Sequence, residues 1–283
     1  MKKKVIGIIF SGKRYGKDEK FFIKEAKKKN IELVFFNTYR DFSEDELERK
    51  IKRCDVIYNS SAEDFAIEYE KTIEMLGKKV YDPSSRYYYI EDKWIFYVKC
   101  KENKIPTPET ILLSENINYA KEELKKHNVW PIILKRVSGT MGQYVEKANN
   151  INEAVRIMNK FWKKGSDKLP IIAQEYIASP SYRVTVINNK IVQTAIKESK
   201  GWKATGVYAE KIKKFPVGKE LRNIVKKVMK TTKISVCGID LLKRNGKWVV
   251  LEVNAEPAYD FFENEREKLI GLTLDFLKSK IKK

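Results

Sequence analysis

The first third of the chain alternates short apolar runs with amphipathic stretches. Runs at 5–10, 31–36, 56–58 and 79–81 have the length and apolar composition of buried strands. Between them, the pattern predicts a helix at 18–29, a second helix that opens at Ser43 with capping-box spacing, and a third that ends at Gly77. Strands that are separated by helices predict a parallel sheet.

The remainder of the chain mixes helices with hairpins. We expect an aromatic-rich helix from Arg86 to about Asn103, because Pro106 and Pro108 cannot continue it. A middle section then predicts a strand at 111–113, a helix at 120–126, a strand at 132–136, a glycine loop with a further strand, and a helix at 152–162. The last section predicts a strand at 171–176, two strands that turn at Asn188-Asn189, a helix at 220–230, a hairpin over 236–254 and a helix at 264–278. A domain boundary is expected near residues 95–105.

Length and composition indicate a large globular protein. A chain of 283 residues, 42% of them hydrophobic, is long enough for two or three packed subdomains. No apolar run approaches the roughly 20 residues of a membrane span, and the run at 5–10 is too short for a signal peptide and lacks a cleavage site. Cys54, Cys100 and Cys237 are far apart and form no metal-type pair, so the cytoplasm is the expected compartment.

The formal net charge of +20 has two interpretations. It can attract an anionic partner, such as a nucleotide, an acidic peptide or nucleic acid. It can also reflect solvated lysine faces on helices, as at 25–29 and 221–227. Because the charge is spread along the chain, without an Arg-rich arm or a base-stacking motif, the pattern favours solvated faces and argues against nucleic acid.

The strongest candidate chemistry lies in the final hairpin. Asp240 interrupts one apolar strand, and Glu252 and Asn254 interrupt the next. A buried carboxylate must be paired or bound to a metal, and three oxygen ligands on one sheet face suit Mg²⁺. Glu252 and Asn254 share a face because strand side chains alternate. The alternative is a surface hairpin whose polar residues face water.

Asp240 joins that face only if the hairpin loop has an odd number of residues. A three-residue loop with Gly246 in the left-handed region pairs residue 243 with 247 and gives this parity. A two-residue Asn-Gly turn would put Asp240 on the opposite face. We therefore predict the three-residue loop.

Weaker signals lie upstream of this hairpin. Lys135 precedes a loop with Gly139 and Gly142, whose amides could cradle phosphate. The loop lacks the Walker A pattern, and an ordinary hairpin turn explains it equally well. Residues 171–177 fit either a plain strand or an adenine-binding hinge. Arg183 and Lys197 are cations on half-buried strands, which favours contact with an anion.

Taken in order, these segments resemble the ATP-grasp superfamily, specifically its RimK-like (ribosomal-protein glutamate ligase) branch. The resemblance spans about residues 86–260 and rests on Glu91–Lys93, Ile105–Pro108, Leu134–Gly142, Gln174–Ile177, Tyr182–Val184, Gly238–Asp240 and Leu251–Pro257. It implies an α/β fold that is α+β in its catalytic part. Residues 1–95 would form a Rossmann-like N-terminal domain, 96–172 a central ATP-grasp subdomain and 173–283 a C-terminal subdomain, with the nucleotide between the last two.

The resemblance also implies a role for each candidate residue. Phosphate binding falls to Lys93, Lys135, Ser138, Gly139, Thr140 and Gly142, and the adenine would be framed by Gln174, Glu175, Tyr176 and Ile177. Asp240, Glu252 and Asn254 would hold one or two Mg²⁺ or Mn²⁺ ions. Arg183, Lys197 and Lys203 would lie near the phosphates or the carboxylate being activated. Transfer of a phosphoryl group to a carboxylate needs charge neutralisation more than an acid–base residue.

The chain also departs from the family pattern. Many relatives follow the equivalent of Lys197 with an aromatic residue, arginine, Thr/Ser-Asn and an Arg-Gly-Gly stretch. Here Lys203 keeps the cation, but Thr205 replaces the asparagine and the double glycine is missing. Glu256 stands where a serine is usual.

The implied activity is ATP-dependent ligation of a carboxylic acid to an amine through an acyl phosphate, with release of ADP. The amine would be glutamate or another amino acid, and the acid a small anionic molecule or an acidic protein or peptide. We also expect a homo-oligomer, a dimer or tetramer. A non-catalytic nucleotide- or nucleic-acid-binding protein with the same fold is the alternative. An NAD-dependent oxidoreductase is disfavoured, because Gly7, Gly12 and Gly16 do not form Gly-x-Gly-x-x-Gly.

Overall fold

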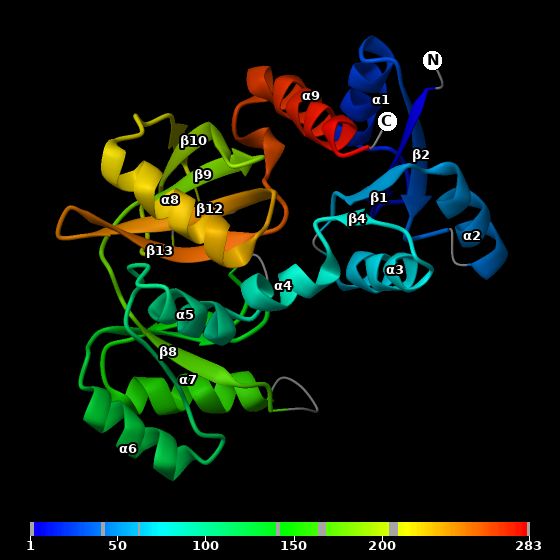
Figure 1. The fold of residues 1–283 in the computed structure, drawn as a ribbon. Coiled ribbons are helices and arrows are strands. Elements are labelled where there is room, and N and C mark those ends of the chain that lie inside the picture. Colours follow the sequence, from blue (N-terminus) through cyan, green and yellow to red (C-terminus); the bar gives the residue numbers. More distant parts are fainter. Residues whose placement is uncertain are drawn as a thin grey trace.

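The computed structural model describes residues 3–40, 43–61, 63–139, 142–163, 168–203 and 209–281. The strands form one parallel sheet near the N-terminus and two antiparallel sheets further along the chain. Figure 1 shows the parallel sheet at the upper right, the C-terminal sheet at the left and the central part at the bottom. A parallel α/β unit followed by α+β units confirms the predicted fold class. Among the described residues, no helix has both the length and the apolar character to cross a bilayer.

The N-terminal sheet contains the four predicted strands in parallel, in the order β2-β1-β3-β4. These strands are β1 (Lys4–Phe10), β2 (Ile31–Asn37), β3 (Val56–Asn59) and β4 (Val80–Tyr81). The helices between them are α1 (Lys17–Lys28), α2 (Glu44–Arg53) and α3 (Asp64–Met75). The Ser43 hydroxyl accepts a hydrogen bond from the Glu46 amide at 3.3 Å, so α2 begins where the capping pattern predicts.

The helix predicted from Arg86 to Asn103 is two helices, so that prediction is wrong. They are α4 (Ser84–Glu91) and α5 (Lys93–Glu102). The chain breaks at Asp92, whose carboxylate accepts hydrogen bonds from the amides of Trp94 and Ile95 at 2.8 and 2.9 Å. Aspartate in this position starts a new helix, and it places Lys93 at the first residue of α5.

The central sheet has the order β5-β8-β6-β7 and is covered on one face by two helices. Its elements are β5 (Thr110–Leu112), α6 (Ile117–His127), β6 (Ile132–Arg136), β7 (Val145–Ala148), α7 (Ile151–Lys163) and β8 (Ile171–Glu175). Leu134 and Ala173 pack with Leu124 and Phe161 in a buried core under the helices. Since strand side chains alternate, Lys135 and Gln174 lie on the other face.

The C-terminal sheet is antiparallel, in the order β11-β10-β9-β12-β13. Its strands are β9 (Ser181–Ile187), β10 (Lys190–Glu198), β11 (Lys211–Lys213), β12 (Val236–Arg244) and β13 (Lys247–Asn254), with α8 (Lys219–Thr232) against one face and the short helix η2 (Tyr259–Phe261) after β13. Asn188 and Asn189 both have positive φ, 50° and 62°, which confirms the predicted hairpin turn. Val184 and Ile239 pack against α8, so their strand neighbours Arg183 and Asp240 occupy the opposite face.

The last helix, α9 (Glu263–Ser279), returns to the N-terminal sheet. Ile270 and Leu274 share a buried core with Ile6 and Phe22. Figure 1 shows α9 beside α1, with the described chain ends near each other.

The division at 1–95, 96–172 and 173–283 remains a prediction. β8 pairs within the central sheet as far as Glu175, which favours ending the central part there. α9 belongs to the third part by this division but packs on the first.

Candidate active site

The turn of the β12–β13 hairpin differs from the predicted one. It contains two residues, Asn245 and Gly246, with φ of 52° and 79°, and it pairs Arg244 with Lys247. These left-handed values are those of the tight Asn-Gly turn. The predicted three-residue loop is therefore wrong. With uninterrupted pairing, this turn would place Asp240 on the wrong face.

A β-bulge restores the required parity. Asp240 pairs with Glu252, but the next residue, Leu241, pairs with Val250, so that Leu251 is an extra residue in β13. One extra residue exchanges the two faces of a strand beyond it. Asp240 and Glu252 therefore face the same way, and Asn254 follows by alternation.

Asp240 is the centre of a buried ionic cluster. Arg183, directly opposite it on β9, donates from Nε and Nη2 to the two carboxylate oxygens at 2.7 and 2.9 Å. Lys197 donates from Nζ at 3.1 Å, and Asn254 from Nδ2 at 3.2 Å. Burial alone would raise the pKa of Asp240, but the Arg183 and Lys197 charges outweigh it, so that the pKa lies below its ordinary value. The structure thus brings together Asp240, Arg183, Lys197 and Asn254.

Gly238 makes room for the Arg183 guanidinium. A Cβ atom added at this position would collide with Arg183 Nη1. That nitrogen is buried without a hydrogen-bond partner among the described residues, whereas the other two nitrogens hold Asp240. The aromatic ring of Phe261 lies 5.8 Å from both the Arg183 guanidinium and Lys197 Nζ. The absence of a side chain at Gly238 therefore allows the guanidinium to reach Asp240 in this orientation.

The central sheet contributes a second buried cation. Lys135 donates from Nζ to Gln174 Oε1 at 2.8 Å, and Gln174 Nε2 donates to the Thr110 hydroxyl at 3.0 Å. Burial lowers the pKa of Lys135 to about 8, and the nearby carboxylates of Glu252 and Asp240 oppose the shift. This electrostatic interaction places Lys135 across from the metal candidates of the C-terminal sheet. The polar faces of the two sheets thus confront each other.

The predicted phosphate loop lies next to Lys93. Lys93 donates from Nζ to the Gly139 carbonyl at 2.9 Å, and its amide donates to the Val137 carbonyl at 2.9 Å. Ser138 and Gly139 are exposed, and Gly139 and Gly142 have φ of 130° and 69°, values that favour glycine. Thr140, another predicted phosphate residue, lies outside the described residues.

The end of β8 is tied to both antiparallel sheets. The Glu175 carboxylate accepts from Arg244 at 3.0 Å and from the Glu109 amide at 3.1 Å. Lys147 Nζ lies 3.8 Å from the centre of the Tyr176 ring, and Ile177 is buried. The structure holds this segment in place, and its role toward adenine remains a prediction.

Two further residues, Lys203 and Glu256, were singled out from the sequence. Lys203 lies with Nζ 5.2 Å from the centre of the Trp202 ring, and Thr205 lies outside the described residues. The Glu256 side chain is accessible to solvent, yet burial and the charges of Asp18 and Asp260 raise its pKa. An accessible carboxylate that is also crowded by protein atoms fits the wall of a cleft.

The oxygen donors present suit a hard divalent cation. Within the described part of the chain, no three His, Cys, Asp or Glu side chains converge as a metal cage. The hairpin instead offers the carboxylates of Asp240 and Glu252 and the amide oxygen of Asn254, whose nitrogen is used by Asp240. Mg²⁺ typically takes one or two carboxylates and completes its shell with substrate phosphates and water. The donor set therefore fits Mg²⁺.

Three contributors were missed from sequence. Gly238 carries a weak signal, because glycine inside a strand often marks a close approach. Thr110, which orients Gln174, and Leu251, the bulge residue, carry no comparable signal.

Comparisons with known proteins bear on this site. A family model described as a RimK-like ATP-grasp domain matches residues 90–275. A coenzyme gamma-F420-2:alpha-L-glutamate ligase from Methanococcus maripaludis is 26% identical over 213 residues, covering 72% of this chain and 70% of that protein. A probable alpha-L-glutamate ligase from Legionella pneumophila is 28% identical over 158 residues, covering 54% of this chain and 51% of that protein. The match spans about half the length of the second relative.

Solved structures resemble the whole chain. A D-alanine–D-alanine ligase from Bacillus anthracis superposes with a TM-score of 0.72 and 17% identity, covering 98% of both chains. A RimK domain ATP-grasp protein from Sphaerobacter thermophilus has a TM-score of 0.72 and 13% identity, covering 97% of this chain and 99% of that one. The ATP-grasp ligase PsnB, complexed with a phosphomimetic variant of its minimal precursor, Mg and ADP, has a TM-score of 0.69 and 17% identity, covering 99% of both chains. At these identities the likeness shows a shared fold.

Proposed function

Because this chain belongs to the RimK-like ATP-grasp family and is an ATP-dependent carboxylate–amine ligase with the ATP-grasp fold, we propose that it joins glutamate to an acidic substrate. Glutamate is supported by the names of the two relatives, both alpha-L-glutamate ligases. An acidic acceptor is supported by the net charge of +20, which attracts anions.

One observation carries this proposal. Two sheets present buried cations to each other, Lys135 on one and Arg183 with Lys197 on the other, around the carboxylates of Asp240 and Glu252. Cations beside carboxylates are the groups that neutralise a transferring phosphoryl group and hold a divalent ion. None of these residues needs to transfer a proton in the first step.

In the first step, a carboxylate oxygen of the acceptor forms a bond to the γ-phosphorus of ATP as the bond to the β–γ bridging oxygen breaks and ADP leaves. Lys93 and Lys135 bind the nucleotide phosphates, and the loop with Ser138, Gly139 and Gly142 covers them. Asp240, Glu252 and Asn254 would hold one or two Mg²⁺ ions, which would neutralise the phosphate charge. Gln174 to Ile177 frame the adenine.

In the second step, the neutral amine of glutamate attacks the acyl carbon, phosphate leaves, and a proton passes to solvent. The charges of Arg183 and Lys197 neutralise the acyl-phosphate oxygens. Asp240 keeps both cations oriented while the bonds change.

The test measures ADP and phosphate release over a panel of acidic acceptors with glutamate, and product mass. We expect activity with glutamate and a mass gain of one glutamyl residue. Glu252→Gln should lower turnover by about 10²–10³-fold, because it removes a charge that acts on the phosphoryl group. Asp45→Asn, on the exposed surface of α2, is the matched control and should turn over like the wild type.

AMP and pyrophosphate as products would contradict the acyl phosphate. Nucleotide binding by a folded wild type, without turnover on any acceptor or amine, would favour the non-catalytic alternative. We further propose that the protein acts in the cytoplasm as a dimer or tetramer. Light scattering after size-exclusion chromatography measures the mass of the assembly and tests the oligomeric state. The three cysteines are free and buried.

A further inference from the structure

The outer surface of α8 carries a strip of cations that the active site does not use. The strip consists of exposed side chains, and we name it the α8 basic face: Lys219, Arg222, Lys226, Lys227, Lys230 and Lys233. The opposite side of α8 is buried against the C-terminal sheet through Leu221, Val225 and Val228. The α8 basic face and Asp240 thus lie on opposite sides of this sheet.

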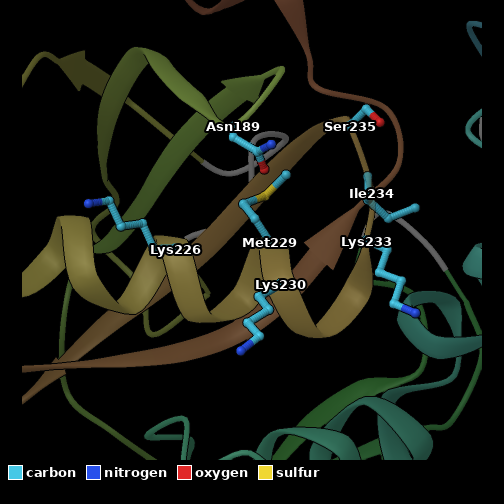
Figure 2. Close-up of a pocket in the computed structure, with 7 residues that line it drawn as sticks. All are labelled: Asn189, Lys226, Met229, Lys230, Lys233, Ile234 and Ser235. Carbon is cyan, nitrogen blue, oxygen red and sulfur yellow. The ribbon is translucent and has the colours of Figure 1, made fainter.

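A surface pocket of about 380 Å³ lies at the end of the α8 basic face. Lys226, Lys230 and Lys233 line it together with Asn189 and Ser235. Figure 2 shows the three lysine side chains leaving the helix in different directions. Because the ammonium groups diverge, they suit several anionic groups along an extended partner better than one small anion.

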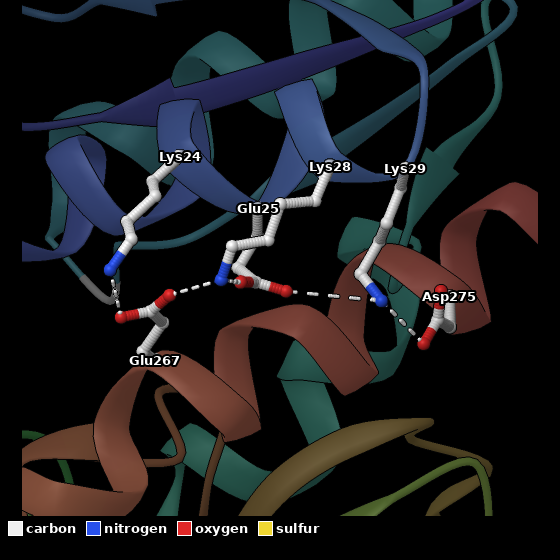
Figure 3. Close-up of polar contacts among 6 residues, drawn as sticks. All are labelled: Lys24, Glu25, Lys28, Lys29, Glu267 and Asp275. Carbon is white, nitrogen blue, oxygen red and sulfur yellow. Dashed lines mark hydrogen bonds and ion pairs between the residues drawn. The ribbon is translucent and has the colours of Figure 1, made fainter.

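Other helices pair some of their lysines with carboxylates. Lys52 pairs with Glu48 at 3.1 Å within α2, and Lys125 with Glu122 at 2.8 Å within α6. Figure 3 shows the α1 lysines paired with carboxylates of α1 and α9. In the described ranges of the chain, by contrast, no carboxylate lies within ion-pair distance of any member of the α8 basic face.

The α8 basic face is also arranged against the stability of its own helix. Lys226 lies four residues from both Arg222 and Lys230, and Lys230 lies three residues from both Lys227 and Lys233. Like charges at these spacings face each other on a helix and destabilise it. A bound polyanion would remove this repulsion.

We propose that the α8 basic face binds a carboxylate-rich polypeptide segment. Nucleic acid is disfavoured because the exposed side of α8 offers no aromatic ring for stacking on a base, and only Arg222 can grip a phosphate with two parallel hydrogen bonds. Lysine point charges at separate positions match carboxylates on a flexible acidic chain. The site is outside the cleft, so it holds a partner without blocking ATP. The partner's effective concentration near the enzyme would rise.

The experiment measures binding of fluorescently labelled poly-L-glutamate by anisotropy at low and physiological salt. We expect binding that weakens with salt. The variant K226Q/K227Q/K230Q should bind about tenfold more weakly or worse, because it removes the centre of the α8 basic face. The control K121Q/K125Q/K126Q removes the same charge from α6 and should stay within about twofold of the wild type.

Glutamine retains high helix propensity, so both variants should keep the wild-type circular dichroism. The α8 variant should melt at or slightly above the wild-type temperature, because it relieves the repulsion between like charges. Equal weakening in both variants would show an effect of net charge alone and overturn the proposal, as would wild-type binding by the α8 variant. DNA that binds as tightly through the same lysines would overturn the polypeptide assignment. ADP release with small-molecule substrates should be unchanged in the α8 variant, so this outcome is separate from that of the proposed ligase reaction.

Discussion

At the scale of single residues, the position of Arg183 depends on the lack of a side chain at Gly238. Gly238 lies under the guanidinium, which reaches Asp240 with two of its nitrogens and keeps the third without a partner. The paired nitrogens fix the orientation of the group. The charge of Arg183 is therefore held in a fixed position before substrates bind.

We predict that Gly238→Ala lowers kcat by about 10²-fold, because a catalytic cation displaced by about 1 Å loses that much rate. Affinity for ATP should change little, since Lys135 and the glycine loop lie on the other sheet. The control is Gly218→Ala, where an added Cβ meets nothing within 4 Å. Steady-state kinetics and calorimetric measurement of ATP binding test this prediction. An unchanged kcat in a folded Gly238→Ala enzyme would show that Arg183 does not need the space that glycine leaves at position 238.

Residue type alone was enough to nominate Asp240, Arg183, Lys197 and Lys135, because charged groups inside apolar strands need partners. The partners themselves were not predictable in the same way. Thr110 orients Gln174 from a strand more than sixty residues earlier, and that contact follows from tertiary pairing, which local pattern does not specify.

At the scale of elements, the β12–β13 hairpin reaches the expected arrangement by an unexpected path. The Asn245-Gly246 turn is the tight form that its sequence favours, and the extra residue lies at Leu251 instead. The alternation of side chains along a strand showed that the hairpin needs one extra residue for Asp240 and Glu252 to share a face. It did not show where in the hairpin this residue lies. The bulge adjoins the Asp240–Glu252 pair, as bulges near active sites often do.

Deletion of Leu251 removes the bulge but should keep turnover, because continuous pairing from the tight turn then brings Glu252 directly opposite Asp240. Gly246→Ala tests the turn separately. Its φ of 79° makes alanine cost about 1–2 kcal/mol of stability, but the parity and hence the activity should persist. ADP release and thermal melts of both variants test this. A folded deletion variant without turnover would show that the bulge itself, and not only the shared face, is needed.

At the scale of the whole molecule, ion pairs join the first helix to the last. Glu267 of α9 accepts from Lys24 and Lys28 of α1 at 2.7 and 2.6 Å. Asp275 accepts from Lys29 at 2.8 Å. These contacts fasten α9 over the parallel sheet, beside the core that contains Ile270 and Phe22.

The α1–α9 ion pairs should make stability depend on acid pH. Hydrogen bonds from Lys24 and Lys28 lower the pKa of Glu267 from 4.5 to about 2. Its contribution is therefore fully present above the ordinary pKa and is lost as pH falls from about 4.5 toward 2. Glu267→Gln should melt lower than the wild type at neutral pH, with the difference shrinking toward about pH 3.

Glu115→Gln, an exposed change of equal charge in the central part, is the control. A difference between Glu267→Gln and the wild type that stays constant across this pH range would exclude the ion pairs as its cause.

The return of α9 to the first sheet sets an order of events during translation. The ribosome completes β1 to β4 early, but Ile6 and Phe22 gain their contacts with Ile270 and Leu274 only after nearly all of the chain has been made. Until then the nascent sheet exposes apolar surface of the kind that chaperones bind. The N-terminal sheet is therefore synthesised before α9 but completes its core only when α9 packs on it.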